Sequence, residues 1–205
     1  MKGIFITIEG PDGAGKTTQR ELLKEYLEKK GYDVLITRDP GGNPISEAIR
    51  EVILNKDFTE MGYMTELLLY ASARAQLVKE NIKPALDAGQ AVIADRFVDS
   101  SAVYQGIGRG VDTVYKVNEF ALQGIMPDMT FLMDLDAQEG ISRKKNQAEL
   151  DRMENEKMEF HQKVVDGYRM LADMHTERIV KIDATLPIDE IHGIIVGYVE
   201  KKLNL

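Results

Sequence analysis

The segment Gly10–Thr17 reads GPDGAGKT, a glycine-rich loop that ends in a lysine and a threonine. Its spacing, G-x-x-x-x-G-K-[ST], suits phosphate binding: backbone N–H groups surround the phosphates, the lysine reaches the β and γ oxygens, and the hydroxyl binds Mg²⁺. A glycine turn that only caps a helix is the alternative. We expect a purine nucleoside triphosphate with Mg²⁺ to contact Gly10, Pro11, Asp12, Gly13, Ala14, Gly15, Lys16, Thr17 and Thr18.

An acid ends a second apolar run, Ala91–Asp95, with the sequence AVIAD. In chains that carry such a glycine loop, the acid at the end of a second buried strand holds Mg²⁺ directly or through water. Asp95 takes this position, so we predict Thr17 and Asp95 as the metal ligands. Strands commonly end in aspartate for other reasons, and it is the glycine loop that favours the metal role.

Four isolated arginines, Arg38, Arg50, Arg74 and Arg96, stand near strand ends or on predicted helices. A guanidinium can bind a phosphate through two parallel hydrogen bonds. The set therefore favours an acceptor that itself carries a phosphate, which is already ionised because its second pKa is about 6. Transfer to such an acceptor needs positioning and charge stabilisation rather than a general base. Each arginine taken alone also fits a surface ion pair.

The elements that must position these groups alternate along the chain. Apolar runs rich in β-branched residues predict strands, and longer segments between them have helical spacing. This alternation predicts an α/β fold of the P-loop NTPase type, with a five-stranded parallel sheet flanked by helices on both faces, as a single domain over residues 1–205. The predicted strands are Gly3–Glu9, Asp33–Thr37, Ala91–Asp95, Met129–Leu135 and Arg178–Asp183; the predicted helices are one that stops near Gly31, Glu60–Leu77, Val114–Leu122 and Glu154–Met174.

Composition restricts the partners of this 205-residue chain. A net charge of −8 argues against a nucleic-acid-binding surface, so any anionic ligand must be met by a local cluster of cations. The apolar runs are far shorter than the ~20 residues that a membrane helix needs. The absence of cysteine excludes disulfides and thiolate metal sites, and it suits a cytoplasmic protein.

Several separated motifs resemble those of the thymidylate kinases, and the resemblance spans essentially the whole chain. It implies transfer of the γ-phosphate of ATP to dTMP, giving dTDP, with Mg²⁺ as cofactor in a homodimer. An apolar helix face such as Val114–Leu122 would suit the dimer interface. The motifs are GPDGAGKTT (10–18), TRDPGG (37–42), YASAR (70–74), DRFVDSSAVYQG (95–106), PDMT (127–130), ELDRME (149–154) and DATLP (183–187).

The resemblance also assigns roles at the acceptor site. Arg96 and Arg38 correspond to arginines that bind the dTMP phosphate, Arg74 to one that donates to thymine O4, and Tyr70 to a ring that stacks on thymine. By itself, Tyr70 in ELLLYASA would be interpreted as core. The other expected contacts are Ser101 and Gln105 at the thymine edge, Tyr104 beneath the sugar, where it disfavours a 2′-hydroxyl, Asp12 toward the sugar hydroxyl and the metal's waters, and Arg50 among the acceptor-binding arginines.

The catalytic arginine of this family stands either in the glycine loop or on a mobile lid. None of the loop positions 11–14 is basic, so the resemblance implies the lid, which we place at about residues 142–155. Arg143 matches the first lid arginine, whereas Lys145 and Gln147 stand where relatives repeat arginines. Whether Arg143, Lys144 or Lys145 meets the transferred phosphate stays open. The expected catalytic residues are Asp12, Lys16, Arg96 and Arg143.

Two alternatives remain beside this interpretation. One is a kinase of another nucleotide or deoxynucleoside, and the other is a nucleotide-dependent switch. A guanine-binding switch would need the run N-K-x-D, and NKDF at 55–58 has its acid one place too early. An assay of whether ATP turnover requires dTMP would distinguish these alternatives. Asp39 stands where the family usually has the longer glutamate, and we expect its contact to be looser.

Overall fold

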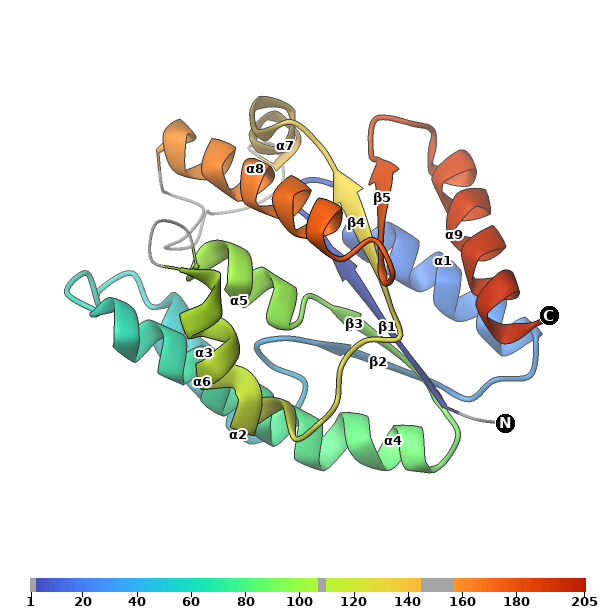
Figure 1. Ribbon diagram of the computed structural model, residues 1–205, viewed down its shortest axis with the longest axis horizontal. Helices are drawn as coiled ribbons and strands as arrows, with labels where there is room; N and C mark the ends of the chain where they lie inside the picture. Colours follow the sequence, from blue (N-terminus) through green and yellow to red (C-terminus); the bar gives the residue numbers. More distant parts are fainter. Residues whose placement is uncertain (1–2, 107–109, 145–156) are drawn as a thin grey trace.

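The structure, a computed structural model, describes residues 3–106, 110–144 and 157–205. Its centre is a five-stranded sheet in the order β2-β3-β1-β4-β5, in which every pairing is parallel (Figure 1). The predicted α/β fold is confirmed, and the predicted strands agree with the observed ones to within one residue at either end. The strands are β1 (Ile4–Glu9), β2 (Val34–Arg38), β3 (Ala91–Asp95), β4 (Met129–Asp134) and β5 (Ile179–Asp183).

Helices cover both faces of this sheet. One face packs against α1 and α9, and the other is covered by α4, α5 and α8, with α2, α3 and α6 beyond them (Figure 1). The helices are α1 (Lys16–Lys29), α2 (Pro44–Leu54), α3 (Tyr63–Leu77), the π-helical turn η1 (Val78–Ile82), α4 (Lys83–Asp87), α5 (Val98–Tyr104), α6 (Val111–Leu122), α7 (Ala137–Lys144), α8 (Met158–Met174) and α9 (Ile188–Leu203).

The central strand β1 shows why two helical layers are needed. Successive side chains of a strand point to opposite faces, and here all six are buried. Ile4, Ile6 and Ile8 join the cluster formed with α1 and α9, whereas Phe5 packs in the cluster on the opposite face. Burying such a side chain contributes about 1.5–3 kcal/mol, so both layers are held by apolar contact. Glu9 ends the strand as a buried acid on the face of Phe5.

The helix predictions need correction at several boundaries. The helix expected from Glu60 begins at Tyr63, and the one expected from Val114 begins at Val111. The predicted stop near Gly31 is confirmed, because α1 ends at Lys29 and Gly31 has φ +87°. Sequence spacing did not predict α2, η1, α4, α5, α7 or α9.

The predicted lid falls largely outside the described residues. Its first residues continue α7, which is described to Lys144, while residues 145–156 are not described. The helix predicted from Glu154 is therefore seen only as α8, from Met158. Across the described ranges, every helix is too short or too polar to cross a membrane.

Candidate active site

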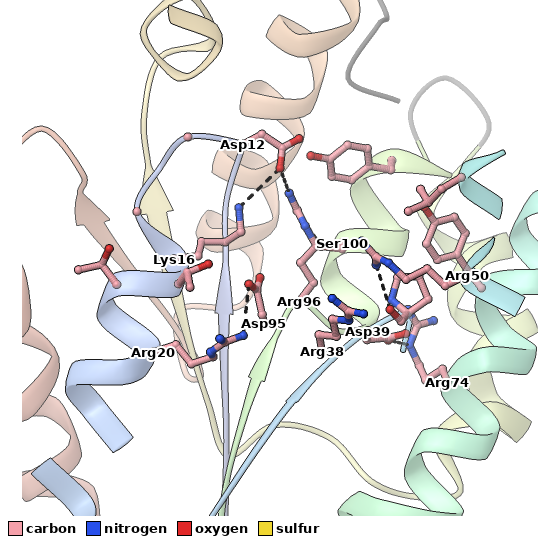
Figure 2. A pocket seen from close by; sticks show the side chains of 18 of the residues that line it. Asp12, Lys16, Arg20, Arg38, Asp39, Arg50, Arg74, Asp95, Arg96 and Ser100 are labelled. Atoms are coloured by element: carbon pink, nitrogen blue, oxygen red, sulfur yellow. Dashed lines mark hydrogen bonds and ion pairs between the residues drawn. The ribbon is translucent and has the colours of Figure 1, made fainter. Parts of the chain in front are cut away.

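The carboxyl ends of β1, β2 and β3 open into a cleft of about 850 Å³. Ligands of open parallel sheets bind at this edge. Figure 2 shows cationic side chains entering the cleft from α1, from β3 and from the helices beyond it. The predicted site residues that line the cleft are Asp12, Gly13, Gly15, Lys16, Thr17, Thr18, Arg38, Arg50, Tyr70, Arg74, Asp95, Arg96, Tyr104, Gln105 and Arg143, whereas Gly10, Pro11, Ala14 and Ser101 lie behind its wall.

Glycines shape the loop between β1 and α1 because other backbone passes too close for a side chain. A Cβ on Gly10 would lie 2.5 Å from the carbonyl oxygen of Met133, and one on Gly13 would lie 2.3 Å from that of Gly140. Gly15, with φ +82°, is the N-cap of α1. The N-terminus of α1 therefore lies at the cleft, where its free N–H groups and partial positive charge favour an anion.

Lys16 is the first residue of α1, and its side chain turns back over the loop. Its Nζ donates to the carbonyl oxygens of Gly10 (3.1 Å) and Pro11 (2.9 Å) and lies 3.9 Å from Asp12 Oδ1. The side chain is only 8% exposed. Burial, assisted by the neighbouring Arg96 cation, lowers the pKa of Lys16 to about 8. A phosphate bound in the loop would supply negative charge beside Lys16 and so favour its protonated form.

Arg96 follows β3 with φ +67°, an uncommon conformation for a residue other than glycine. Its Nη2 lies 2.7 Å from Asp12 Oδ1, and its Nη1 donates to the Gly10 carbonyl oxygen at 3.1 Å. Lys16 and Arg96 thus converge on the same carboxylate of the loop (Figure 2). The guanidinium carbon lies 5.2 Å from the centre of the Tyr104 ring, a cation–π distance.

Arg74 anchors the opposite end of the cleft. Its side chain is 1% exposed, and its Nε lies 2.5 Å from Asp39 Oδ2. The guanidinium also donates to Asn118 Oδ1, to Ser101 Oγ at 2.8 Å and to the Phe97 carbonyl oxygen at 3.3 Å. Asp39, although shorter than the family's usual glutamate, is fully buried against the arginine through Oδ2. Burial raises the pKa of Asp39, and Arg74 opposes that rise.

The other predicted acceptor residues have partners of their own among the neighbouring residues. Arg38 is half exposed, and its Nη2 lies 2.7 Å from Glu47 Oε2, while Arg50 Nη1 donates to the Pro40 carbonyl oxygen at 2.9 Å. Gln105 Nε2 donates to Glu66 Oε1 at 3.0 Å. Ser101 does not line the cleft; it supports Arg74 from behind.

The two predicted metal ligands lie at the donor side of the cleft. Thr17 is exposed on the first turn of α1, and Asp95 is partly buried at the end of β3. Hydroxyl and carboxylate oxygens suit Mg²⁺, which keeps several waters and is held by few protein ligands together with phosphates. The described residues contain no group of three or more His, Cys, Asp and Glu side chains that would hold a metal by themselves. The residues therefore fit an ion that is held jointly with a nucleotide.

Arg143 lies where the main cleft meets a second cavity of about 320 Å³. Its Nη2 lies 2.5 Å from Glu139 Oε1, and its Nη1 donates to the Ala184 carbonyl oxygen at 3.2 Å. The second cavity is lined by apolar residues of α9 and by Gln19 and Thr18 of α1. It continues the loop's cleft toward the segment 183–187. Lys145 lies outside the described residues.

Comparison with known proteins agrees with this geometry. Residues 8–195 match the profile of the family described as Thymidylate kinase. The chain belongs to the thymidylate kinase family. It is 49% identical over 208 residues to the thymidylate kinase of Geobacillus thermodenitrificans (strain NG80-2), covering 100% of this chain and 92% of that protein. It is 47% identical to that of Geobacillus sp. (strain WCH70), covering 100% and 99%.

The family assignment extends to solved structures. The crystal structure of thymidylate kinase from Ehrlichia chaffeensis superposes with a TM-score of 0.79 at 31% sequence identity. The match covers 98% of this chain and 99% of that one. The arrangement of the sheet and its helices is therefore that of a thymidylate kinase.

Sequence reasoning missed several residues of this family member's site, among them Ser100, which lines the cleft and accepts from Arg96. Arg20 lines the cleft, and its Nη1 lies 3.8 Å from Asp95 Oδ2; the spacing of four from Lys16 on one helix could have indicated it. Glu9 is a buried acid immediately before the glycine loop, which is a weaker signal. Tyr168 on α8 donates to Glu9 at 2.9 Å across 159 positions, and nothing local in the sequence indicates that contact.

Proposed function

We propose that this protein transfers the γ-phosphate of ATP to dTMP, giving dTDP and ADP. The observation that carries the proposal is the contact of Arg96 with Asp12, because it joins the glycine loop directly to the arginine-lined end of one cleft. A donor phosphate on the loop and an acceptor phosphate at Arg96 would then lie side by side. The family membership supports the same reaction.

The chemistry of this transfer needs little beyond positioning. The acceptor phosphate is already ionised at neutral pH, so no side chain has to remove a proton from it. Lys16 and the N–H groups of the loop hold the donor phosphates, and Arg96 binds the acceptor phosphate and lowers the repulsion between the two anions. Mg²⁺, when bound through Thr17 and Asp95, would neutralise charge on the donor phosphates.

The base of dTMP is proposed to lie between Tyr70 and Arg74. Among the described contacts of Arg74, four N–H groups donate to protein atoms, and the fifth, on Nη1, would donate to thymine O4. Gln105 would meet the thymine edge, and Tyr104, packed against Arg96, would fill the space of a 2′-hydroxyl. Arg38 and Arg50 would support the acceptor phosphate from the outer side of the cleft.

We also propose that Arg143 is the lid arginine. It ends the described part of α7 between the main cleft and the second cavity, so a small movement of α7 would bring it over the donor phosphates. Arg143→Ala, Lys144→Ala and Lys145→Ala separate the candidates by their effects on kcat. A larger loss in Lys144→Ala or Lys145→Ala than in Arg143→Ala would contradict this assignment.

A homodimer and a cytoplasmic location complete the proposal. Helices α3 and α6 pack together, and they expose apolar side chains: Met64 is 45%, Leu68 49% and Phe120 86% exposed. Exposed apolar side chains on two neighbouring helices suit a two-fold interface between copies of the chain. Sedimentation of the wild type and of Phe120→Glu tests it, since the charge would shift the chain toward monomers.

The reaction itself is tested by mixing the protein with Mg-ATP and following ADP formation with dTMP, dUMP, ribo-TMP, dCMP or no acceptor. We expect strong turnover with dTMP, weak turnover with ribo-TMP and little without an acceptor. Preference for another nucleotide would favour a different nucleotide kinase. ATP hydrolysis that ignores every acceptor would favour a nucleotide-dependent switch.

A further inference from the structure

Glu9 is a buried acid that does not line the cleft, yet it lies directly behind it. Its carboxylate is 1% exposed at the end of β1. Oε1 accepts from the backbone N–H of Phe97 at 2.7 Å and of Ser100 at 3.3 Å, the residues that begin α5. Oε2 accepts from Ser100 Oγ at 2.6 Å and from the Tyr168 hydroxyl at 2.9 Å. One carboxylate therefore joins β1, α5 and α8.

The same two hydroxyls face Arg96. Arg96 Nη1 donates to Ser100 Oγ at 3.2 Å and to the Tyr168 hydroxyl at 2.9 Å. A hydroxyl has one proton and two lone pairs, and a carboxylate can only accept. The two hydroxyl oxygens also lie 2.8 Å apart, and either could donate to the other. When Glu9 is ionised, however, its carboxylate is the stronger acceptor, so both hydroxyls turn their protons to it and present lone pairs to the guanidinium. The carboxylate thus fixes the direction of both hydroxyls, and the hydroxyls fix Arg96.

We propose that Glu9 and Tyr168 are positioning residues that hold Arg96 in place to bind the phosphate of the acceptor nucleotide. The proposal rests on the proposed function and adds two residues that do not line the cleft. Arg96 has the left-handed backbone conformation, which persists only where its surroundings fix it. Glu9 supplies that constraint, because it binds the N–H of Phe97, the next residue of the chain.

The charged surroundings of Glu9 bear on how firmly the arrangement holds. Burial and the nearby Asp99 raise the pKa of Glu9 to about 7, while Arg96 lowers it. The negative charge of Glu9 in turn acts on the pKa of Lys16 and of Tyr115. A protonated Glu9 would donate to one of the hydroxyls, and that hydroxyl would then have to turn its own proton toward Arg96. The positioning is therefore strongest when the carboxyl group is ionised.

The decisive experiment is a double-mutant cycle between Tyr168→Phe and Arg96→Ala, measured as kcat/KM for dTMP at saturating Mg-ATP. A hydrogen bond to a charged group is worth enough that Tyr168→Phe should lower this ratio about tenfold in the wild-type background, with KM for ATP unchanged. In the Arg96→Ala background the same substitution should change kcat/KM less than about twofold, because its target is gone. A tenfold loss in both backgrounds, or in neither, would overturn the proposal.

Tyr115→Phe is the matched control. Its hydroxyl lies 3.4 Å from Asp99, another buried acid, on α5, and it makes no described contact with Arg96. We expect kcat/KM for dTMP to stay at the wild-type value. Thermal unfolding shows whether Tyr168→Phe folds, and Ser100→Ala, which removes the other hydroxyl, replaces it in the cycle if it does not. If the wild-type protein fails to phosphorylate dTMP, both the proposed function and the positioning proposal are wrong. If the wild type is active but the effects of the two substitutions on kcat/KM simply add, only the positioning proposal is wrong.

Discussion

The two ends of the cleft are built in different ways. The donor end is one continuous stretch, from Gly10 to Thr18, in which backbone N–H groups, the N-terminus of α1 and Lys16 face the cleft. The acceptor end is assembled from side chains on α3, α5 and α6 and on the segment after β2, and its central cation, Arg74, is buried among them.

This difference decides what a substitution can damage. At the donor end, a side chain can be removed while the backbone that surrounds the phosphates stays in place. At the acceptor end, the buried side chains are also structural partners of one another, as Arg74 is of Asp39 and Ser101, so removing one leaves a buried polar group without its bond. The donor end should therefore lose activity and keep stability, and the buried part of the acceptor end should lose both.

The largest expected effect is on stability, from Arg74→Met. This change leaves Asp39 as an uncompensated buried charge, which should lower the free energy of unfolding by about 3–5 kcal/mol in urea titration. Arg38→Met is the control at the same end, because that arginine is 51% exposed and pairs with Glu47 at the surface. Its cost should be about 0–1 kcal/mol. Equal losses in the two variants would show that burial does not distinguish the arginines.

Lys16→Met probes the donor end. Loss of one preorganised cation at the reacting phosphates should lower kcat about 10²–10³-fold. The free energy of unfolding and the affinity for dTMP, measured by calorimetry, should stay close to the wild type. Lys24→Met, at an exposed position of α1 that pairs with Glu28, should leave all three quantities unchanged. A loss of dTMP affinity as large as the loss in kcat would erase the contrast between the two ends.

The contrast also explains how much the sequence could predict. The glycine loop and its strand were predictable because their contacts are local: Lys16 meets carbonyls five and six positions away. The sequence predicted the four arginines as one acceptor-binding set, and all four line the cleft, but their hydrogen-bond partners were not predicted. Arg74 bonds Asp39 and Asn118, which lie 35 and 44 positions away, and only the folded chain brings these together. Tyr168 is a further example, since one tyrosine on an amphipathic helix resembles any core residue.

A pH profile should separate the two ends. Since burial lowers the pKa of Lys16 to about 8, its charge is complete below that pH, and kcat/KM for ATP should fall up to tenfold per unit above it. Since burial raises the pKa of Glu9 to about 7, its carboxylate forms above that pH, and kcat/KM for dTMP should rise through pH 7. Glu9→Gln should remove the rise near 7 and leave only the ionisation of the dTMP phosphate, near about 6. The fall above 8 should persist in that variant, and its disappearance would mean that the two titrations are not separate.

The smallest expected effect is that of Tyr70→Phe. If the ring acts by stacking on the base, removing the hydroxyl should change kcat/KM for dTMP less than about twofold, whereas Tyr70→Leu should cost roughly 1–3 kcal/mol of dTMP binding. The two substitutions share the position on α3 and differ in whether an aromatic face remains. The ATP parameters should be unaffected in both variants, because Tyr70 lines the acceptor end only. A loss in Tyr70→Phe as large as that in Tyr70→Leu would show that the hydroxyl, rather than the ring, contacts dTMP. Binding at the acceptor end would then depend on polar contacts at this position too.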